Sequence, residues 1–310
     1  MIHHCKMGVL LMGLVATTLA AQNKFEVTQG EKQVDVKLNG ELLTTYHTTV
    51  GAKPILWPIL GPHGIEMTRA YPQVADGKKG EKKDHIHHRS FWFTHGDVNG
   101  ISFWHENAKH GNTVHRKFVK VSGGERAVIS TINDWVGPDG KKHCEDQRTY
   151  TFFVDGKNRY VDVDITVRAA FGPVTFGDTK EGSFGVRTAG TMKVDSKLGG
   201  KIVTSEGLKG TEAWGKPAAW VDYTGPVEGK TVGIAILNHP QSYGYPSHWH
   251  VRTYGLFAAN PFGLKAFKTG KDGSLKLNKD ESFTLRYRVI FHEGDTVSAD
   301  IAGEFKKYSR

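Results

Sequence analysis

The sequence predicts an all-β protein, a large antiparallel β-sandwich with a short C-terminal helix. Two long segments, 160–169 and 282–292, alternate strictly between apolar and polar residues. A period of two places the apolar side chains of each segment on one face of a half-buried strand. Many short runs of this kind, separated by Gly-rich turns and with almost no helical spacing, favour a β-sandwich or a closed β architecture.

The N-terminal part predicts three short strands, at 25–28, 33–38 and 42–48. Asn39-Gly40 between the second and third is a strong hairpin signal. The following segment, 54–64, is rich in Pro and Gly and predicts an irregular crossover.

Further alternating runs predict five more strands, at 114–121, 126–135, 147–154, 218–223 and 231–237. At the C-terminus Val297, Ile301 and Phe305 are spaced by four, which predicts a helix. Thr296 or Ser298 is available as its N-cap.

Residues 1–21 predict a signal peptide, and 22–310 a single β-sandwich domain. A basic start with Lys6 leads into the apolar run 8–16, which is too short to span a bilayer, and small residues follow at Ala20 and Ala21. We therefore expect an exported protein, periplasmic or extracellular, with no membrane span in the mature chain.

Charge and cysteine content exclude several classes of function. The formal charge of +9 falls to +8 without Lys6, and only 78–83 forms a basic run, which is typical of a solvated loop rather than of nucleic-acid binding. Cys144 is the one cysteine of the predicted mature chain, so an internal disulfide is excluded. Nothing in the sequence predicts the oligomeric state.

Six of the sixteen histidines lie within twenty-six residues: His85, His87, His88, His95, His105 and His110. Imidazole acts as metal ligand, proton shuttle or hydrogen-bond partner near neutral pH. Aromatic and short polar residues alternate with these histidines, as a sugar-sized ligand requires. We therefore expect the functional site here.

A second histidine-rich segment lies at 239–252. If both segments are strands, His85, His87 and Arg89 share one face with Asp84 and His88 opposite. In the second, His248, His250 and Arg252 share a face with Trp249 opposite. Two His-x-His pairs from different strands can build a metal site, and they can equally serve as hydrogen-bonding groups around a sugar.

Glu181 precedes a predicted strand that ends near Arg187. A carboxylate paired with a histidine can act as general base while the imidazole acts as acid. Asp97 and Glu106 are alternative carboxylates. Equally, Glu181 can be a solvated turn residue.

The candidate residues fall into three groups. Candidate catalytic residues are His87, His88, His95, Glu181 and His250. Candidate substrate-binding residues are Arg89, Trp92, Asp97, Asn99, Trp104, Arg187, His239, Trp249, Arg252 and Asn260. Candidate ligands of a divalent metal ion are His85, His87, His248 and His250.

Several motifs together resemble the DUF6807 family, long labelled "methane oxygenase PmoA". They are Asp84-His85-x-His87-His88-Arg89, His95-Gly96-Asp97-Val98-Asn99-Gly100, Phe103-Trp104, and the segments 178–187, 214–223 and 239–263. Ile86 departs from the proline expected there.

The resemblance implies an exported bacterial protein, common in glycan-degrading bacteria, with a galactose-mutarotase-like supersandwich. In that fold a histidine and a carboxylate on a concave sheet act on a pyranose ring. The older label is misleading, because a membrane monooxygenase subunit needs apolar spans and this chain has none after its N-terminal run.

The leading hypothesis is therefore a carbohydrate-active enzyme that acts on a glycan or an oxidised sugar. Its acid/base chemistry, with or without a metal, would cleave a keto-glycoside by elimination or hydrolysis, or epimerise a sugar. The alternatives are a non-catalytic glycan-binding module and a metal-binding (copper) protein. Few methionines are present, so a soft copper site lacks support.

Overall fold

A computed structural model describes residues 1–2, 23–78 and 81–310. The signal peptide predicted at 1–21 falls almost entirely outside the described residues. In the segments that are described, no helix has the length and apolar character needed to cross a membrane.

The first of two large sheets holds eight antiparallel strands in the order β1-β2-β3-β4-β5-β11-β16-β15. The strands are β1 (Phe25–Gln29), β2 (Gln33–Leu38), β3 (Glu41–Val50), β4 (Lys53–Ile59), β5 (Phe91–His95), β11 (Gly182–Arg187), β16 (Leu256–Asn260) and β15 (His248–Val251). Its second half therefore joins segments that lie far apart in the sequence.

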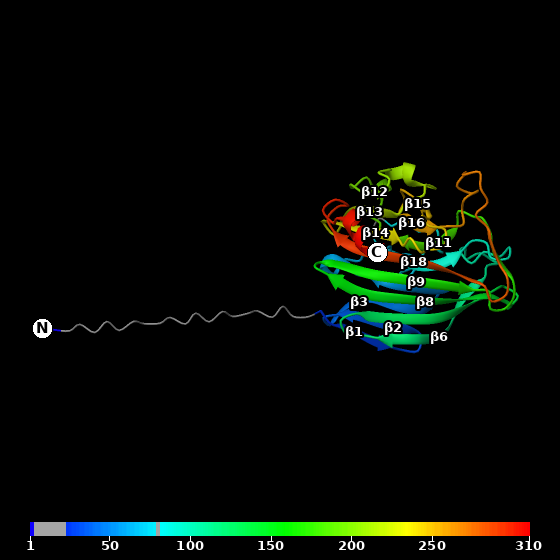
Figure 1. Cartoon of the computed structure of the whole chain (residues 1–310), viewed down its shortest axis with the longest axis horizontal. Helices are drawn as coiled ribbons and strands as arrows, with labels where there is room; N and C mark the ends of the chain where they lie inside the picture. The colour runs from blue at the N-terminus through cyan, green and yellow to red at the C-terminus, as the bar shows by residue number, and fades with distance from the viewer. Residues whose placement is uncertain (3–22, 79–80) are drawn as a thin grey trace.

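The second sheet is also eight-stranded and antiparallel, in the order β12-β13-β14-β18-β9-β8-β7-β6. The strands are β12 (Lys201–Thr204), β13 (Trp220–Val227), β14 (Lys230–Asn238), β18 (Ser282–Glu293), β9 (Asn158–Arg168), β8 (Lys142–Asp155), β7 (Ala127–Val136) and β6 (Asn112–Ser122). In Figure 1 this sheet faces the viewer, and the C-terminus lies beside β14 and β18.

The remaining elements are short. β10 (Val174–Phe176) pairs with β17 (Leu275–Leu277), and three 3₁₀ turns occur at η1 (Pro62–Gly64), η2 (Val194–Ser196) and η3 (Gly210–Ala213). The one α-helix of the described residues is α1 (Ile301–Tyr308).

The main core lies between the two sheets. Phe184 of the first sheet stacks on Tyr287 of the second with ring centroids 4.8 Å apart, and Tyr46 meets Tyr150 at 5.9 Å. The strict alternation in β9 and β18 supplies one apolar face to this core. The predicted all-β antiparallel sandwich with a short C-terminal helix is therefore confirmed.

Two sequence predictions about local structure are wrong. The segment 54–64 is not an irregular crossover throughout, because 53–59 forms β4. Pro54 and Pro58 fit into β4 because the pairing of β3 with β4 is interrupted beside each of them. Neither position therefore needs a backbone N–H for a hydrogen bond to β3. The helix is capped by Asp300, whose carboxylate accepts a hydrogen bond from the Gly303 N–H, rather than by Thr296 or Ser298.

The middle of the first sheet is covered on both faces. Every residue of β5, β11 and β16 is buried. Phe91, Phe93 and Phe257 point into the main core, so alternation sends Trp92 and Ala258 to the outer face. There they join a small second core, and this outer face carries the candidate site.

Candidate functional site

The floor of the site is the second core on the outer face of the first sheet. It contains Ile55, Trp92, Trp104, Leu256 and Ala258, all fully buried. The Trp92 ring lies directly against the backbone of Gly185 in β11, where a Cβ atom would sit 2.7 Å from it. Only a residue without a side chain lets the indole lie flat there.

A turn, not a strand, carries the first histidine group. His85 has a positive φ of 46°, and the His88 N–H donates to the His85 carbonyl at 2.9 Å. The His85 and His88 rings stack at 4.7 Å, and His87 meets His88 edge-on at 4.6 Å. The expectation that His88 points away from His85 and His87 is wrong, because the turn removes the period of two.

Two buried cations hold this turn by its carbonyl groups. Arg69 donates to the carbonyls of His85 and His88 and to the Asp84 carboxylate. Lys53 donates to the His87 carbonyl at 2.9 Å and pairs with Glu106 at 3.0 Å. The histidine rings are therefore positioned by a charged layer beneath them.

Strand β15 brings in the second histidine group. Trp249 is buried in the main core, and alternation turns His250 to the outer face, as predicted. A tight turn follows, in which the Gly255 N–H donates to the Arg252 carbonyl at 3.0 Å. Tyr254 in this turn stacks on His85 with centroids 5.3 Å apart, so the two segments meet.

The two segments enclose a pocket of about 210 Å³, called here the histidine pocket. Its lining residues are His85, His87, His88, His105, Lys180, Glu181, His250, Arg252 and Tyr254. Residues separated by more than 150 positions therefore share one cavity.

The protonation of His88 is decided by Arg187. Nη1 of Arg187 lies 2.9 Å from Nδ1 of His88, and a guanidinium can only donate. Nδ1 is therefore the acceptor, and the proton of the neutral ring sits on Nε2. Burial first, and then the charge of Arg187, holds the pKa of His88 well below its usual range. Nε2 is buried and has no hydrogen-bond partner in the described chain.

His87 and His250 are also neutral at pH 7. Burial lowers the pKa of His87 to about 3 and that of His250 to about 4. The pKa of His105 is lowered by burial as well. Nδ1 of His250 is buried and, among the described residues, has no hydrogen-bond partner.

Glu181 is the one carboxylate among the described residues that line the pocket. It lies beside Lys180, with which it forms an ion pair. Glu106, an alternative carboxylate, is instead paired with Arg89 and Lys53; although burial raises its pKa, these partners hold it at about 2. Asp97 caps a turn by accepting from the Gly100 N–H at 2.9 Å.

Several predicted site residues lie beside or beneath the pocket rather than in its lining. Trp92 and Trp104 form the floor, and Arg187 is buried under His88. Arg89 is bound to Glu106. These side chains therefore support the lining residues.

Other predicted site residues serve the fold elsewhere. His95 is buried between Ser183 and the Gly177 carbonyl. Asn99, Trp249 and Asn260 hydrogen-bond to backbone groups, at Thr175, Ala218 and Phe262 respectively. His239 packs edge-on against Tyr308 beside α1. Asp97, in its turn, also lies outside the lining.

Three lining residues were not among the predicted site residues: His105, Lys180 and Tyr254. His105 belongs to the histidine cluster, so its spacing was a usable signal. The His87 and His105 rings lie 4.9 Å apart. Lys180 and Tyr254 carry no local pattern that separates them from surface residues.

The four predicted metal ligands do not gather around one point. His248 stacks on Phe267 and does not line the pocket. In residues 1–2, 23–78 and 81–310, no group of three or more His, Cys, Asp or Glu side chains is placed to hold a metal ion. A divalent metal therefore stays a prediction, which elemental analysis of the purified protein would test.

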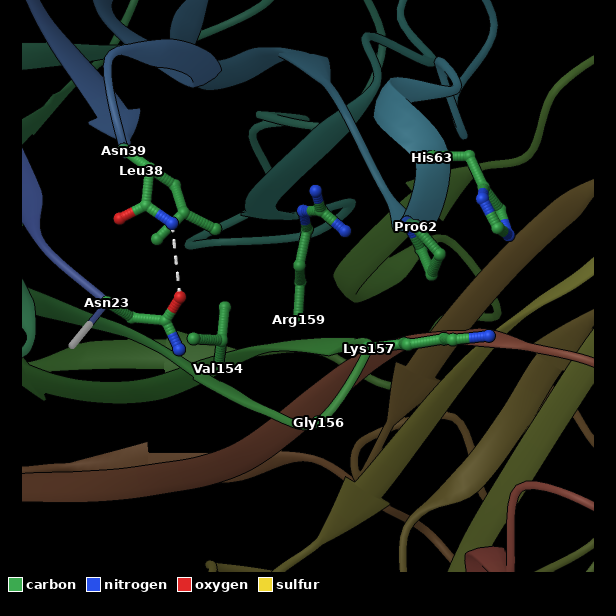
Figure 2. A pocket seen from close by; sticks show the side chains of 9 residues that line it. All are labelled: Asn23, Leu38, Asn39, Pro62, His63, Val154, Gly156, Lys157 and Arg159. Carbon is green, nitrogen blue, oxygen red and sulfur yellow. Dashed lines mark hydrogen bonds between the residues drawn. The ribbon is translucent and has the colours of Figure 1, made fainter. Parts of the chain in front are cut away.

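Two of the larger pockets offer less chemistry. One, of about 320 Å³, lies where the turn at Asn39 meets the β8–β9 turn; Figure 2 shows Arg159 between Leu38 and Pro62, with Lys157 and His63 at the rim. The other, of about 520 Å³ beside β12, is mainly apolar and has no histidine in its lining. Neither pairs a carboxylate with a histidine in its lining.

Comparison with known proteins places the chain as follows. A family model described as "Family of unknown function (DUF6807)" matches residues 33–306. No curated protein sequence matches the chain.

Solved structures with a similar arrangement include three carbohydrate-related proteins. An α-galactosidase from Geobacillus stearothermophilus is 11% identical, with a TM-score of 0.44 over 87% of this chain and 41% of that chain. A galactose mutarotase-like protein from Lactobacillus casei is 11% identical (TM-score 0.37, 86% of this chain and 100% of that chain). A glycoside hydrolase family 97 enzyme from Pseudoalteromonas sp. is 11% identical (TM-score 0.35, 87% and 34%).

The chain spans about two fifths of the length of the α-galactosidase and about one third of the family 97 enzyme. Function does not follow from a shared architecture, so it has to be sought in the side chains of this chain.

Proposed function

The chain belongs to the DUF6807 family, and we propose that it is a carbohydrate-active enzyme that moves a proton at a sugar ring. The observation that carries the proposal is the histidine pocket. It combines a carboxylate, Glu181, with two neutral histidines, His88 and His250, that each have a ring nitrogen without a partner in the described chain. Buried polar atoms left unpaired in this way are a sign of a ligand site.

The size and the lining of the pocket suit a single ring. Its volume of about 210 Å³ lies below the roughly 300–1,000 Å³ of sites for drug-sized ligands. Tyr254 contributes the edge of its aromatic ring, because His85 and the guanidinium groups of Arg187 and Arg252 lie over the ring, and the other lining residues are polar. A pyranose needs this combination of an apolar surface with directed hydrogen bonds.

Each group has a distinct role in the proposed reaction. Glu181 takes a proton from a ring carbon beside a carbonyl group or from a ring hydroxyl. His88 donates from Nε2 to the oxygen on which negative charge develops, as a neutral imidazole can when its pKa is low. Nδ1 of His250 accepts a hydrogen bond from a substrate hydroxyl and orients the ring.

Elimination and epimerisation share this first proton transfer, whereas in direct hydrolysis Glu181 would take the proton from the attacking water. In elimination the electrons of the broken C–H bond expel the glycosidic oxygen. In epimerisation the proton returns to the other face of the ring. The roles of Glu181, His88 and His250 are the same in these cases, so the proposal concerns the shared step.

The test is turnover of a panel of keto-glycosides and glycans in D₂O, followed by NMR. Glu181→Gln and His250→Ala should each reduce turnover and deuterium incorporation at the ring by roughly 10²-fold or more. The matched control is His239→Ala, because His239 lies beside α1 and not in the pocket. Sugar binding without any turnover or exchange would contradict an enzyme and favour a glycan-binding module.

We also propose that the protein is exported. The support is the sequence of 1–21, with its basic start, apolar run and small residues. N-terminal sequencing of the protein from the periplasmic or culture fraction should begin near Gln22. An intact N-terminus on a protein confined to the cytoplasm would contradict export.

A further inference from the structure

The histidine pocket and the charged layer beneath it carry an excess of positive charge. Five cations act on the lining side chains, namely Lys53, Arg69, Lys180, Arg187 and Arg252. Three carboxylates oppose them, namely Asp84, Glu106 and Glu181. A partly buried, positively charged wall attracts an anionic ligand.

Four of the five cations already have a carboxylate partner. Lys53 pairs with Glu106 at 3.0 Å, and Arg69 and Arg187 share Asp84 at 2.7 and 3.1 Å. Lys180 pairs with Glu181. Arg252 is the exception, because no carboxylate of the described residues lies within ion-pair distance of it.

Arg252 is nevertheless held in place. Its N–H donates to the Leu256 carbonyl at 2.8 Å, which fixes the backbone at the end of β15. Its guanidinium lies over the rings of Trp214 and Tyr254, 5.7 Å from each centroid. Stacking on two aromatic rings orients the planar guanidinium and leaves its N–H groups for another partner.

We infer that the sugar bound in this pocket is acidic, a uronate whose carboxylate pairs with Arg252. The inference rests on the proposed function and adds the class of substrate to it. A guanidinium matches a carboxylate in planarity and spacing, so two parallel hydrogen bonds can form. The substrate would thus supply a carboxylate partner for Arg252, whereas the other four cations have theirs within the chain.

The chemistry of a uronate agrees with the roles of the other groups. The ring proton beside the carboxylate becomes more acidic when Arg252 neutralises the carboxylate charge. Glu181 takes that proton, and the C–H electron pair forms a C=C bond. The C–O bond on the next carbon then breaks, and the departing oxygen takes a proton from solvent. No oxidant or cofactor enters this step.

The test compares ligands that differ only in this one group. Binding of methyl glucuronoside, its uncharged amide and methyl glucoside is measured by calorimetry with the full chain. We expect the uronate to bind roughly tenfold or more tightly than the other two, with the difference shrinking at high salt. The galacturonate series, run in parallel, covers the other common ring configuration.

Variants assign the preference to one side chain. Arg252→Gln should abolish the preference for the uronate over methyl glucoside, and Arg252→Lys should restore part of it. Lys157→Gln is the control, since Lys157 is a cation in the other pocket (Figure 2). Circular dichroism confirms that each variant is folded.

The outcomes separate this inference from the proposed function. Equal binding of uronate and neutral sugar would overturn the inference, while Glu181-dependent turnover of the neutral sugar would leave the proposed function standing. Uronate binding that depends on Arg252, without turnover of any sugar, would support the inference and contradict an enzyme. Tighter binding of glucose 6-sulfate than of glucuronate would overturn the carboxylate assignment.

Discussion

Arg187 donates to Nδ1 of His88 across 2.9 Å and so places the proton of that ring on Nε2. Nδ1 of a histidine often carries a proton and donates it to a backbone carbonyl or a carboxylate, which orients the ring. Here a cation does so, which also prevents His88 from becoming charged. The same guanidinium is bound to Asp84 at 3.1 Å, which anchors it from the other side.

Replacing Arg187 should therefore change the state of His88 as well as its position. In Arg187→Met we expect His88 to lose its preferred tautomer and turnover to fall by roughly 10²-fold. The ¹⁵N chemical shifts of the ring nitrogens report the tautomer directly. Arg187→Lys retains a donor, so it should retain more activity; unchanged ¹⁵N shifts in Arg187→Met would contradict the assignment.

His250 should make the folded state less stable in acid. Burial lowers its pKa to about 4, so the unfolded chain, with a pKa near 6.5, binds more protons at pH 5. The contribution of His250 to the free energy of unfolding is therefore fully present above pH 6.5 and is lost as the pH falls towards 4. Between these values the free energy of unfolding should fall by on the order of 1 kcal/mol per pH unit.

Urea denaturation at several pH values between 7.5 and 4.5 measures this effect. The free energy of unfolding of His250→Ala should fall less steeply with decreasing pH than that of the wild type. His239→Ala serves for comparison. Identical slopes for His250→Ala and wild type would show that His250 is not the group responsible.

Gly185 should tolerate no side chain. In Gly185→Val the new Cβ would meet the Trp92 ring at 2.7 Å, so the indole has to move and the floor of the pocket with it. We expect a loss of about 1–3 kcal/mol of stability, seen as a fall of several degrees in Tm. Gly30→Ala is the control, because its Cβ would meet atoms no closer than 3.6 Å.

Lys53 should matter for both stability and activity. In Lys53→Met the His87 carbonyl loses its buried donor and Glu106 keeps only Arg89. Breaking a buried ion pair costs about 3–5 kcal/mol, and the displaced turn should lower turnover. In the double variant Lys53→Met with Glu106→Gln, the largely buried Arg89 loses its carboxylate partner as well, so its thermal melt should be lower than that of the single variant.

The second sheet was largely predictable from the sequence. β9 and β18 have one face in the core and one towards solvent, so their apolar residues alternate. The middle of the first sheet offered no such signal. Asn260, which sits in a turn-like sequence, ends β16 and is buried, because both faces of that strand are covered.

The site was predictable in its membership more than in its geometry. Histidine clustering pointed to His85, His87, His88 and His250, and the pocket contains them. The faces in the first segment were wrong, because the positive φ of His85 starts a turn there, and a histidine alone does not mark such a position. The supporting contacts of Arg69 and Lys53 join segments distant in the chain, which a single sequence does not reveal.

The histidine pocket lies on the outer face of the first sheet, away from the packing between the sheets. Much of its lining comes from connections, at 84–88 and 252–255, rather than from the strands that fill the interior. These connections could therefore be exchanged, and the lining of the pocket with them, without redesigning the sandwich. The same separation makes the two connections natural targets for grafting new specificities onto this scaffold.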